Sequence, residues 1–227
     1  MTVIVLLGLS VSALILLQVF SAMSQRNIET YPYELVQSFE TFEVRNYEAS
    51  LFTSVKIPSN EYKKVSSTGF SILANYIFGN NENNQKIAMT SPVAMTLEDS
   101  MTMMFMVPKE LNKDNLPQPN NAEITFVEEP AKTVAVITFG GWANDTIINK
   151  YKQQLITALD KKGINHTNKF YFLGYNPPYE ILNRRNEIMV ELTSDVWWSI
   201  IEYAKKTTVL IAERATKRLF FFLLDFE

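Results

Sequence analysis

One order of extended and helical segments occurs twice along this chain of 227 residues, and it constrains the fold more than any other feature. In each copy, an extended stretch with an internal break leads into an amphipathic helical pattern and then into two strand-like segments. The first copy comprises residues 41–57 (broken at 46–50), 61–78, 86–97 and 101–107, and the second comprises residues 124–127 and 133–139 (broken at Glu129-Pro130), 145–162, 170–175 and 188–192. Neither copy covers both faces of a sheet by itself. We therefore predict an α+β fold in which two related halves form a twisted antiparallel β-barrel flanked by two helices.

Apolar spacing and end signals define the two helical patterns. The first has an apolar face formed by Phe70, Leu73 and Ile77, and the second has one formed by Ile148, Tyr151, Leu155 and Leu159. Gly79 tolerates the left-handed conformation that commonly ends a helix, and Gly163 offers the same signal after the second pattern. We expect Asp145 or Thr146 to cap the start of the second helix.

The composition excludes several classes of protein and site. Hydrophobic residues make up 47% of the chain, which is enough for a packed core and argues against disorder. The net charge of -3 leaves no cationic excess to pair with phosphates, so we expect no nucleic-acid partner. With no cysteine and one histidine, the chain has no disulfide, no cysteine-ligated metal, no thiol catalyst and no histidine-rich metal site.

The polar residues form no catalytic pattern. Neither a nucleophile–base pair nor a phosphate-binding glycine loop occurs, so the sequence predicts a protein without enzymatic activity. Carboxylates near the strand ends are more simply explained by ion pairs than by acid–base catalysis. We expect Glu43, Glu187 and Glu191 to pair with Arg45, Arg184 or Arg185.

Both ends of the chain extend beyond the repeated region. Residues 1–25 contain no charged side chain, and the apolar run over 3–23 is long enough to cross a bilayer as a helix. A removable signal peptide and a retained membrane anchor both fit this segment, so we expect a membrane-anchored or exported protein, with the side of the membrane open. Residues 193–227 predict an amphipathic helical extension, which would dock on the domain, lie on a membrane surface or bind a partner.

Five short segments stand in the order and spacing of a known family. They are Glu43-Val44-Arg45-Asn46-Tyr47, Gly69-Phe70 through Tyr76-Ile77-Phe78-Gly79-Asn80, Lys86-Ile87-Ala88-Met89-Thr90-Ser91-Pro92-Val93, Gly174-Tyr175-Asn176-Pro177-Pro178 and Asn183-Arg184-Arg185-Asn186-Glu187. On these motifs, residues 31–192 resemble the SOUL haem-binding protein family. The resemblance implies a twisted β-barrel with two helices and reversible binding of haem or another tetrapyrrole. It also implies a distant likeness to bacterial effector-binding domains that hold flat hydrophobic molecules.

The residues that could ligate iron do not form a strong axial site. Some family members are thought to use a histidine where this chain has Asn46, whose amide is a poor iron ligand. His166 lies outside the family motifs in a polar run, and we expect it in an exposed loop. Met89 and the group Met101, Met103, Met104 and Met106 offer thioethers, but methionines that alternate in a strand are typical of core filling. We therefore expect haem or another porphyrin to bind without tight ligation, and no metal site of the protein's own.

The resemblance implies a binding mode that depends on apolar contact with the first helix. Its candidate ligand face consists of Phe70, Leu73, Ala74 and Ile77, and the same side chains also fit a helix face buried in the core. Lys63 and Lys64, near the helix start, are candidates to pair with the propionates. Tyr175, Pro177 and Pro178 would add a rigid aromatic wall. The alternatives are an interaction or structural module that does not bind haem, and an effector-type binder of another flat hydrophobic ligand.

Overall fold

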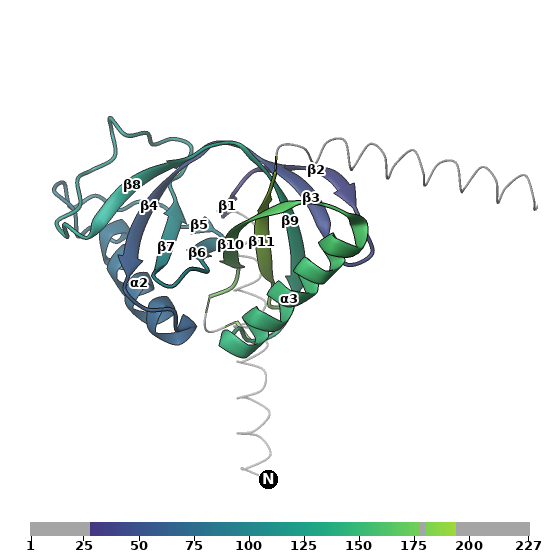
Figure 1. Cartoon of the computed structure of the whole chain (residues 1–227). Helices are drawn as coiled ribbons and strands as arrows, with labels where there is room; N and C mark the ends of the chain where they lie inside the picture. The colour runs from purple at the N-terminus through teal and green to yellow at the C-terminus, as the bar shows by residue number, and fades with distance from the viewer. Residues whose placement is uncertain (1–27, 178–179, 194–227) are drawn as a thin grey trace, which may run out of the picture.

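The computed structural model describes residues 28–177 and 180–193 (Figure 1). Nine strands form one antiparallel sheet that curls into an arch, in the order β2-β3-β9-β11-β10-β6-β7-β4-β8. The elements are β1 (Glu29–Thr30), β2 (Tyr33–Ser38), β3 (Glu43–Tyr47), β4 (Ser50–Ile57), α2 (Tyr62–Ile77), β5 (Thr90–Ser91), β6 (Val93–Thr96), β7 (Met101–Met106), β8 (Ile124–Glu129), β9 (Lys132–Phe139), α3 (Asp145–Lys162), β10 (His166–Gly174) and β11 (Asn186–Leu192). The predicted α+β fold with two helices beside a curled antiparallel sheet is confirmed.

The two related halves are visible in the strand order. In the first half, β4, α2, β6 and β7 follow one another and place their strands in the order β4-β7-β6; in the second, β9, α3, β10 and β11 give β9-β11-β10. The strand before each half crosses to the other half, since β3 pairs with β9 and β8 pairs with β4. This exchange explains the two breaks in the extended pattern, because the chain changes partners between β3 and β4 and between β8 and β9.

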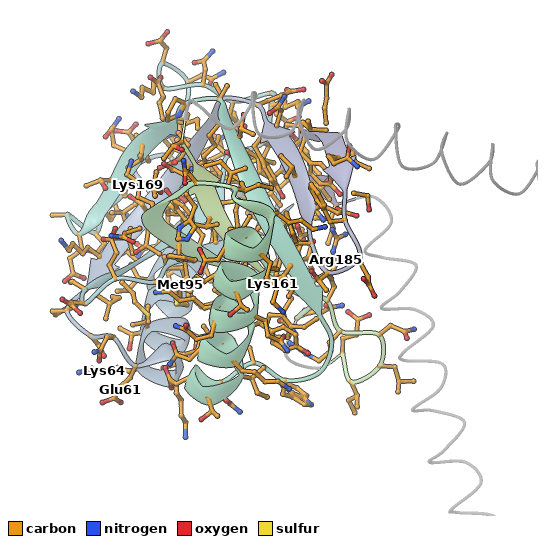
Figure 2. All side chains as sticks on the ribbon, turned by 45° about the vertical axis from the view of Figure 1, so that its right-hand side comes forward. Glu61, Lys64, Met95, Lys161, Lys169 and Arg185 are labelled. Carbon is orange, nitrogen blue, oxygen red and sulfur yellow. The ribbon has the colours of Figure 1, made fainter. Side chains whose placement is uncertain are left out.

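The starts of the two helices lie close together. The Asp145 side chain accepts a hydrogen bond from the backbone N–H of Tyr62 at 2.8 Å, and so joins the start of α3 to the start of α2. Asn144 caps α3, because its side-chain oxygen accepts from Ile147 N at 2.9 Å; the expectation of Asp145 or Thr146 was wrong by one residue. Figure 2 labels Glu61 and Lys64 at the lower edge of the molecule, the side on which α3 also begins.

Two segments differ from the sequence-based expectation. Residues 86–97 were expected as one strand, but only β5 and β6 are regular, and a cis peptide bond at Ser91-Pro92 separates them. Strand β2 was missed; it is an edge strand that pairs only with β3 in the sheet, and most of its side chains are exposed or half-buried. An edge strand with little buried surface shows no apolar alternation from which it could be predicted.

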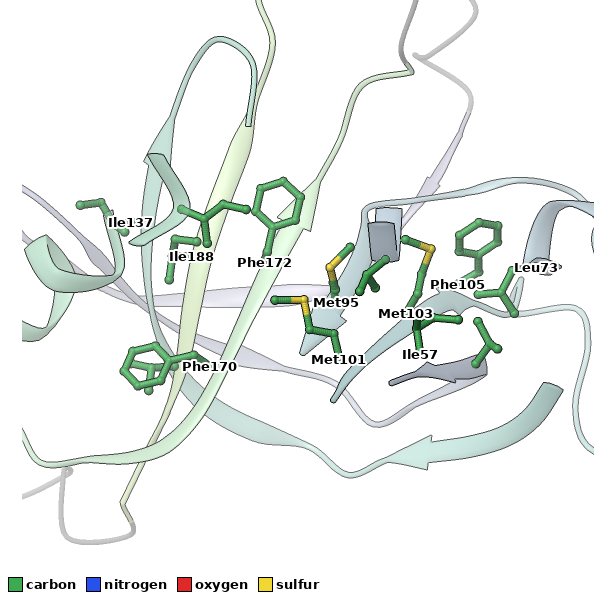
Figure 3. Close-up of a cluster of buried hydrophobic side chains, with 14 of the residues drawn as sticks. Ile57, Leu73, Met95, Met101, Met103, Phe105, Ile137, Phe170, Phe172 and Ile188 are labelled. Carbon is green, nitrogen blue, oxygen red and sulfur yellow. The ribbon is translucent and has the colours of Figure 1, made fainter. Parts of the chain in front are cut away.

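Two buried clusters hold the domain together. The larger joins α2, α3 and strands of both halves, and Figure 3 shows part of it: Ile57, Leu73, Met95, Met101, Met103, Phe105, Ile137, Phe170, Phe172 and Ile188. The smaller is rich in tyrosine and contains Tyr31, Tyr47, Phe52 and Tyr171. Met101, Met103, Met104 and Met106 are all buried, so their prediction as core filling is confirmed, whereas Met89 is exposed.

Gly69 has a packing reason to stand in the middle of α2. A Cβ at this position would lie 3.0 Å from the Cβ of Met103 on β7, closer than side chains pack. The helix therefore approaches the sheet as near as its backbone allows. No helix among the described residues is long and apolar enough to cross a membrane. The predictions for residues 1–25 and for the extension beyond Thr193 lie outside the described residues.

Candidate functional site

The predicted ligand face of α2 is directed mainly at the protein's own core. Leu73, Ala74 and Ile77 are buried, and Leu73 and Ile77 belong to the large cluster. Phe70 is half-buried, and its ring meets that of Phe105 edge-on at a centroid distance of 5.4 Å. Lys63 and Lys64, in the first turn of α2, are exposed to solvent. The structure thus leaves the two lysines and part of Phe70 accessible, and the use of this helix as a ligand surface stays a prediction.

The predicted wall after β10 is divided between a buried network and a surface loop. The hydroxyl of Tyr175 donates to Glu187 Oε2 at 2.8 Å, and the Arg185 guanidinium lies 4.2 Å from the centre of the tyrosine ring. Pro177 lies in the loop that connects β10 to β11 and is half-buried. Pro178 falls outside the described residues. Tyr175 is therefore engaged in protein contacts, and its role in a ligand wall stays a prediction.

Glu187 is the centre of the most extensive polar network in the described residues. Its side chain is fully buried, and Arg45 donates to its two oxygens at 3.1–3.2 Å. Arg185 donates at 2.6 and 3.0 Å, and the hydroxyl of Thr138 at 3.2 Å. Arg45 also pairs with Glu43 at 2.6 Å. The predicted pairing of Glu43 and Glu187 with arginines is confirmed, although Glu187 is a buried hub rather than a strand-end residue.

Electrostatics keep this buried carboxylate charged. Burial opposes the ionisation of Glu187, but the charge and hydrogen bonds of Arg45, and then those of Arg185, outweigh burial and hold the pKa of Glu187 below its usual value. Burial, reinforced by the negative charge of Glu187, raises the pKa of Tyr47 to about 12 and also raises the pKa of Tyr175. The tyrosines therefore stay neutral hydrogen-bonding groups at physiological pH, and the network acts as a structural ion pair between β3 and β11.

Glu191 pairs with lysines instead of the expected arginines. It accepts from the hydroxyl of Tyr171 at 2.8 Å and contacts Lys132 and Lys169, each at 3.4 Å. Burial works against the charge of Glu191, but these partners lower its pKa. The prediction was wrong about the partner, because the antiparallel pairing of β11 with β9 and β10 places lysines from both neighbours around Glu191.

Two residues considered as iron ligands, Asn46 and His166, are engaged with the protein. The amide oxygen of Asn46 accepts from the Thr133 hydroxyl at 2.8 Å, across the β3–β9 pair. His166 is half-buried at the start of β10, not in an exposed loop as expected, and its Nδ1 lies 2.6 Å from the carbonyl oxygen of Thr167. Among the described residues, no three His, Cys, Asp or Glu side chains are grouped to hold a metal ion.

Two surface recesses lie apart from the predicted ligand residues. One, of about 210 Å³, is lined by Asn60, Leu97, Glu98, Asp99, Met101, Asp145, Ile148, Asn149 and Lys152. Three carboxylates and one lysine line this recess. The other, of about 370 Å³, is lined by Asp160, Ile164, Asn165, His166 and Thr193. Neither recess contains a residue of the predicted ligand face.

Arg184 was expected to pair with a strand-end carboxylate, but in the structure it contacts carbonyl oxygens and Trp142, a residue that the sequence analysis missed. Arg184 donates to the carbonyl oxygens of Pro177 and Glu180 at 2.9 and 2.7 Å, and its guanidinium lies 4.1 Å from the centre of the Trp142 ring. Burial raises the pKa of Tyr62 at the start of α2, and the positive charge of Arg184 works against this shift. A tryptophan after two glycines and just before a helix cap was the available signal.

Comparisons with known proteins agree on the family. A model of the SOUL heme-binding protein family matches residues 28–191. Heme-binding protein 2 of Homo sapiens is 32% identical over 161 residues, which cover 65% of this chain and 76% of the relative. Heme-binding protein 1 of Xenopus laevis is 26% identical over 155 residues, which cover 65% of this chain and 81% of the relative.

The fold also has solved counterparts. The EcmrR C-terminal domain matches with a TM-score of 0.54 at 13% identity, over 71% of this chain and 98% of that domain. This likeness concerns the fold alone. The family match covers most of the chain and coincides with the described sheet and its two helices. The chain therefore belongs to the SOUL haem-binding protein family.

Proposed function

We propose that this protein binds haem or another tetrapyrrole reversibly, as a non-catalytic carrier or buffer, in a membrane-associated or exported SOUL domain. Family membership over residues 28–191 is the observation that carries the proposal, since the relatives are heme-binding proteins 1 and 2. The described residues contribute a compatible surface rather than a deep pocket. Binding would then be driven by apolar contact and by pairing of the propionates with cationic side chains.

The start of α2 is suited to receive the propionates. Lys63 and Lys64 occupy the first turn of the helix, where the macrodipole disfavours cations unless an anion lies nearby. The Asp145 carboxylate already accepts one backbone N–H there, and the lysine ammonium groups remain exposed to solvent. Phe70 lies two turns further along the helix and is half-buried. A ligand on this surface would place its carboxylates at the lysines and its ring against the exposed edge of Phe70.

The binding mode makes a direct prediction about the metal. Because the candidate iron ligands Asn46 and His166 already contact protein oxygens, the iron would contribute little to affinity. Titration of the full chain with hemin and with metal-free protoporphyrin should give a saturable, one-to-one Soret change with similar affinity for both. Saturation with hemin alone would show axial ligation and refute contact-driven binding. Absence of saturation with either ligand would refute the carrier function.

The lysines offer a second, independent test. The double substitution Lys63→Glu and Lys64→Glu should weaken porphyrin binding by roughly tenfold or more, because two charge-assisted pairs become repulsive. The double substitution Lys86→Glu and Lys109→Glu makes the same change in net charge at two other exposed positions. Equal effects of the two double substitutions would show that the α2 lysines have no specific role.

A structural or interaction module that does not bind haem is the second candidate. The burial of Leu73, Ala74 and Ile77 favours it, since these side chains already serve the core. Phe70→Asp separates the two functions: lost porphyrin binding with an intact thermal transition supports the ligand surface, whereas unfolding supports the core role. An effector-type binder of another flat hydrophobic molecule would saturate with that molecule but not with porphyrin.

Membrane association is supported by the sequence of residues 1–25, which has no charged side chain. N-terminal sequencing of the mature protein distinguishes a cleaved signal from a retained anchor. A retained anchor should also leave the full chain in the membrane pellet after alkaline extraction, whereas a chain that begins at Ile28 should be released. Recovery of both chains in the supernatant, with residue 1 intact, would refute both forms of membrane targeting.

A further inference from the structure

A group of large apolar side chains is exposed beside the starts of the two helices. Trp142, Ile181 and Leu182 have 52%, 58% and 62% of their surface exposed. Trp142 precedes the cap of α3, and the other two lie in the connection from β10 to β11. We call these three residues the apolar tip. A tryptophan and two aliphatic side chains that are exposed together to solvent indicate a contact surface for another apolar molecule or assembly.

Hydrogen bonds and a cation–π contact hold the residues beside the apolar tip in place. Arg184 donates to the carbonyl oxygens of Pro177 and Glu180 and to that of Asn176 at 3.3 Å, and its guanidinium packs on the ring of Trp142. The side-chain oxygen of Asn176 accepts from Arg185 N at 2.6 Å and ties the two ends of the connection together. The apolar side chains are thus presented by an organised structure.

The apolar tip lies at the end of the sheet at which the chain enters the described domain. Gly174, the last residue of β10, is the register partner of both Asn186 and Val93. Two residues before Val93, Ser91 pairs with Thr30. The first described strand, β1, therefore lies near the end of the sheet from which the β10–β11 connection projects. Residues 1–25 contain no charged side chain.

We propose that the apolar tip docks on a lipid bilayer, with the indole of Trp142 at the membrane interface and Leu182 in the outer acyl region. The inference rests on the membrane association proposed above and adds the face of the domain that meets the lipid. The charged groups beside the tip are hydrogen-bonded within the protein, Arg184 to carbonyl oxygens and the buried Glu180 carboxylate to Asn176, so the tip does not require anionic lipid. In this orientation the starts of α2 and α3 face the bilayer, and a tetrapyrrole dissolved in the lipid reaches the α2 surface without crossing water.

Depth-dependent fluorescence quenching tests the proposal. In the full chain with Trp197→Phe and Trp198→Phe, Trp142 is the sole tryptophan. This chain is reconstituted with phosphatidylcholine vesicles that carry brominated acyl chains, and vesicle flotation shows whether it is bound. We expect a blue-shifted emission, with intensity reduced by about twofold or more relative to unbrominated lipid. Leu182→Ser should relieve much of this quenching. Leu35→Ser, a matched change at a side chain 56% exposed on β2, should leave it unchanged.

Each of the remaining outcomes would refute the proposal that the apolar tip docks on the bilayer. If the full chain floats with the vesicles but Trp142 is quenched by aqueous iodide and not by brominated lipid, the membrane association stands and the tip does not touch the bilayer. If Trp142 is shielded from both quenchers, protein covers the tip, from a partner or a second copy. If the chain does not float, the proposed membrane association fails as well. Hemin titration of the same chain reports on tetrapyrrole binding separately.

Discussion

Glu187→Gln tests whether the buried ion network fastens β3 to the strands of the second half. The substitution keeps the size of the side chain but removes the negative charge that faces Arg45 and Arg185. Arg45 is almost fully buried, so its charge would lose its main partner without gaining water. Breaking one side of a buried ion pair typically costs about 3–5 kcal/mol.

Two features of the structure favour the lower part of that range. Arg45 keeps its pair with Glu43 at 2.6 Å, and 42% of the Arg185 side chain is exposed, so this guanidinium can rehydrate. We therefore expect a loss of about 3 kcal/mol in the free energy of unfolding. For a domain of this size, this corresponds to a fall in melting temperature of about 6–12 °C.

Urea and thermal unfolding, followed by circular dichroism, measure the effect. The matched control is Glu128→Gln, which makes the same chemical change in an exposed pair with Lys113 at 3.1 Å. Exposed ion pairs contribute about 0–1 kcal/mol, so the control should change the free energy of unfolding very little. If Glu187→Gln costs no more than Glu128→Gln, the network contributes to the specific placement of β3 beside β9 and β11 but not to stability.

Three further predictions concern acid stability and local packing. The pKa of Glu187 is lower in the folded than in the unfolded state. The stabilisation from its charge is therefore fully present above the unfolded-state pKa and is lost as the pH falls through the folded-state pKa. The difference in unfolding free energy between wild type and Glu187→Gln should shrink below about pH 4. Asn144→Ala removes the cap of α3 and should lower the free energy of unfolding by about 1 kcal/mol, measured by urea unfolding. The control Asn149→Ala, on the exposed face of the same helix, should leave the free energy of unfolding unchanged or raise it slightly. Equal effects of the two substitutions would contradict the capping role of Asn144. Gly69→Ala should destabilise by about 1–2 kcal/mol despite its better helix propensity, because the new Cβ meets the Cβ of Met103; a stabilised variant would show that α2 has room to move.

Local sequence patterns predicted the helices and strands that bury one face in the core. The limits of α2 and α3 agree with the predicted helices within one residue at each end, because their apolar residues recur at helical spacing and Gly79 and Gly163 follow them with positive φ. Most strands of the two halves were predicted from alternating apolar residues; the exception is residues 86–97, where only β5 and β6 are regular. The repeat could be detected because both halves have the same order of segments, and this order determines how their strands pair.

Long-range pairing and exposure could not be predicted in the same way. The break after β3 was visible, but the exchange of β3 and β8 between the halves depends on partners distant in sequence. The arginine pairing of Glu187 was predicted, yet its full burial was not, because Arg45 stands 142 residues away. The exposure of Trp142 has one local signal, its place between two glycines and a helix cap. Surfaces built from several connections are therefore the least predictable part of this chain.

The burial of α2 limits where a tetrapyrrole can bind. Leu73 and Ile77 are almost fully buried against the sheet, and exposing two such side chains costs about 3–6 kcal/mol. A ligand that had to lift α2 to reach them would lose roughly 10²–10⁴-fold in apparent affinity. Lys63 and Lys64 are already exposed, so a ligand at the start of α2 would avoid this cost. The ligand surface is therefore expected at the first turns of the helix, while the apolar residues of its later turns belong to the core.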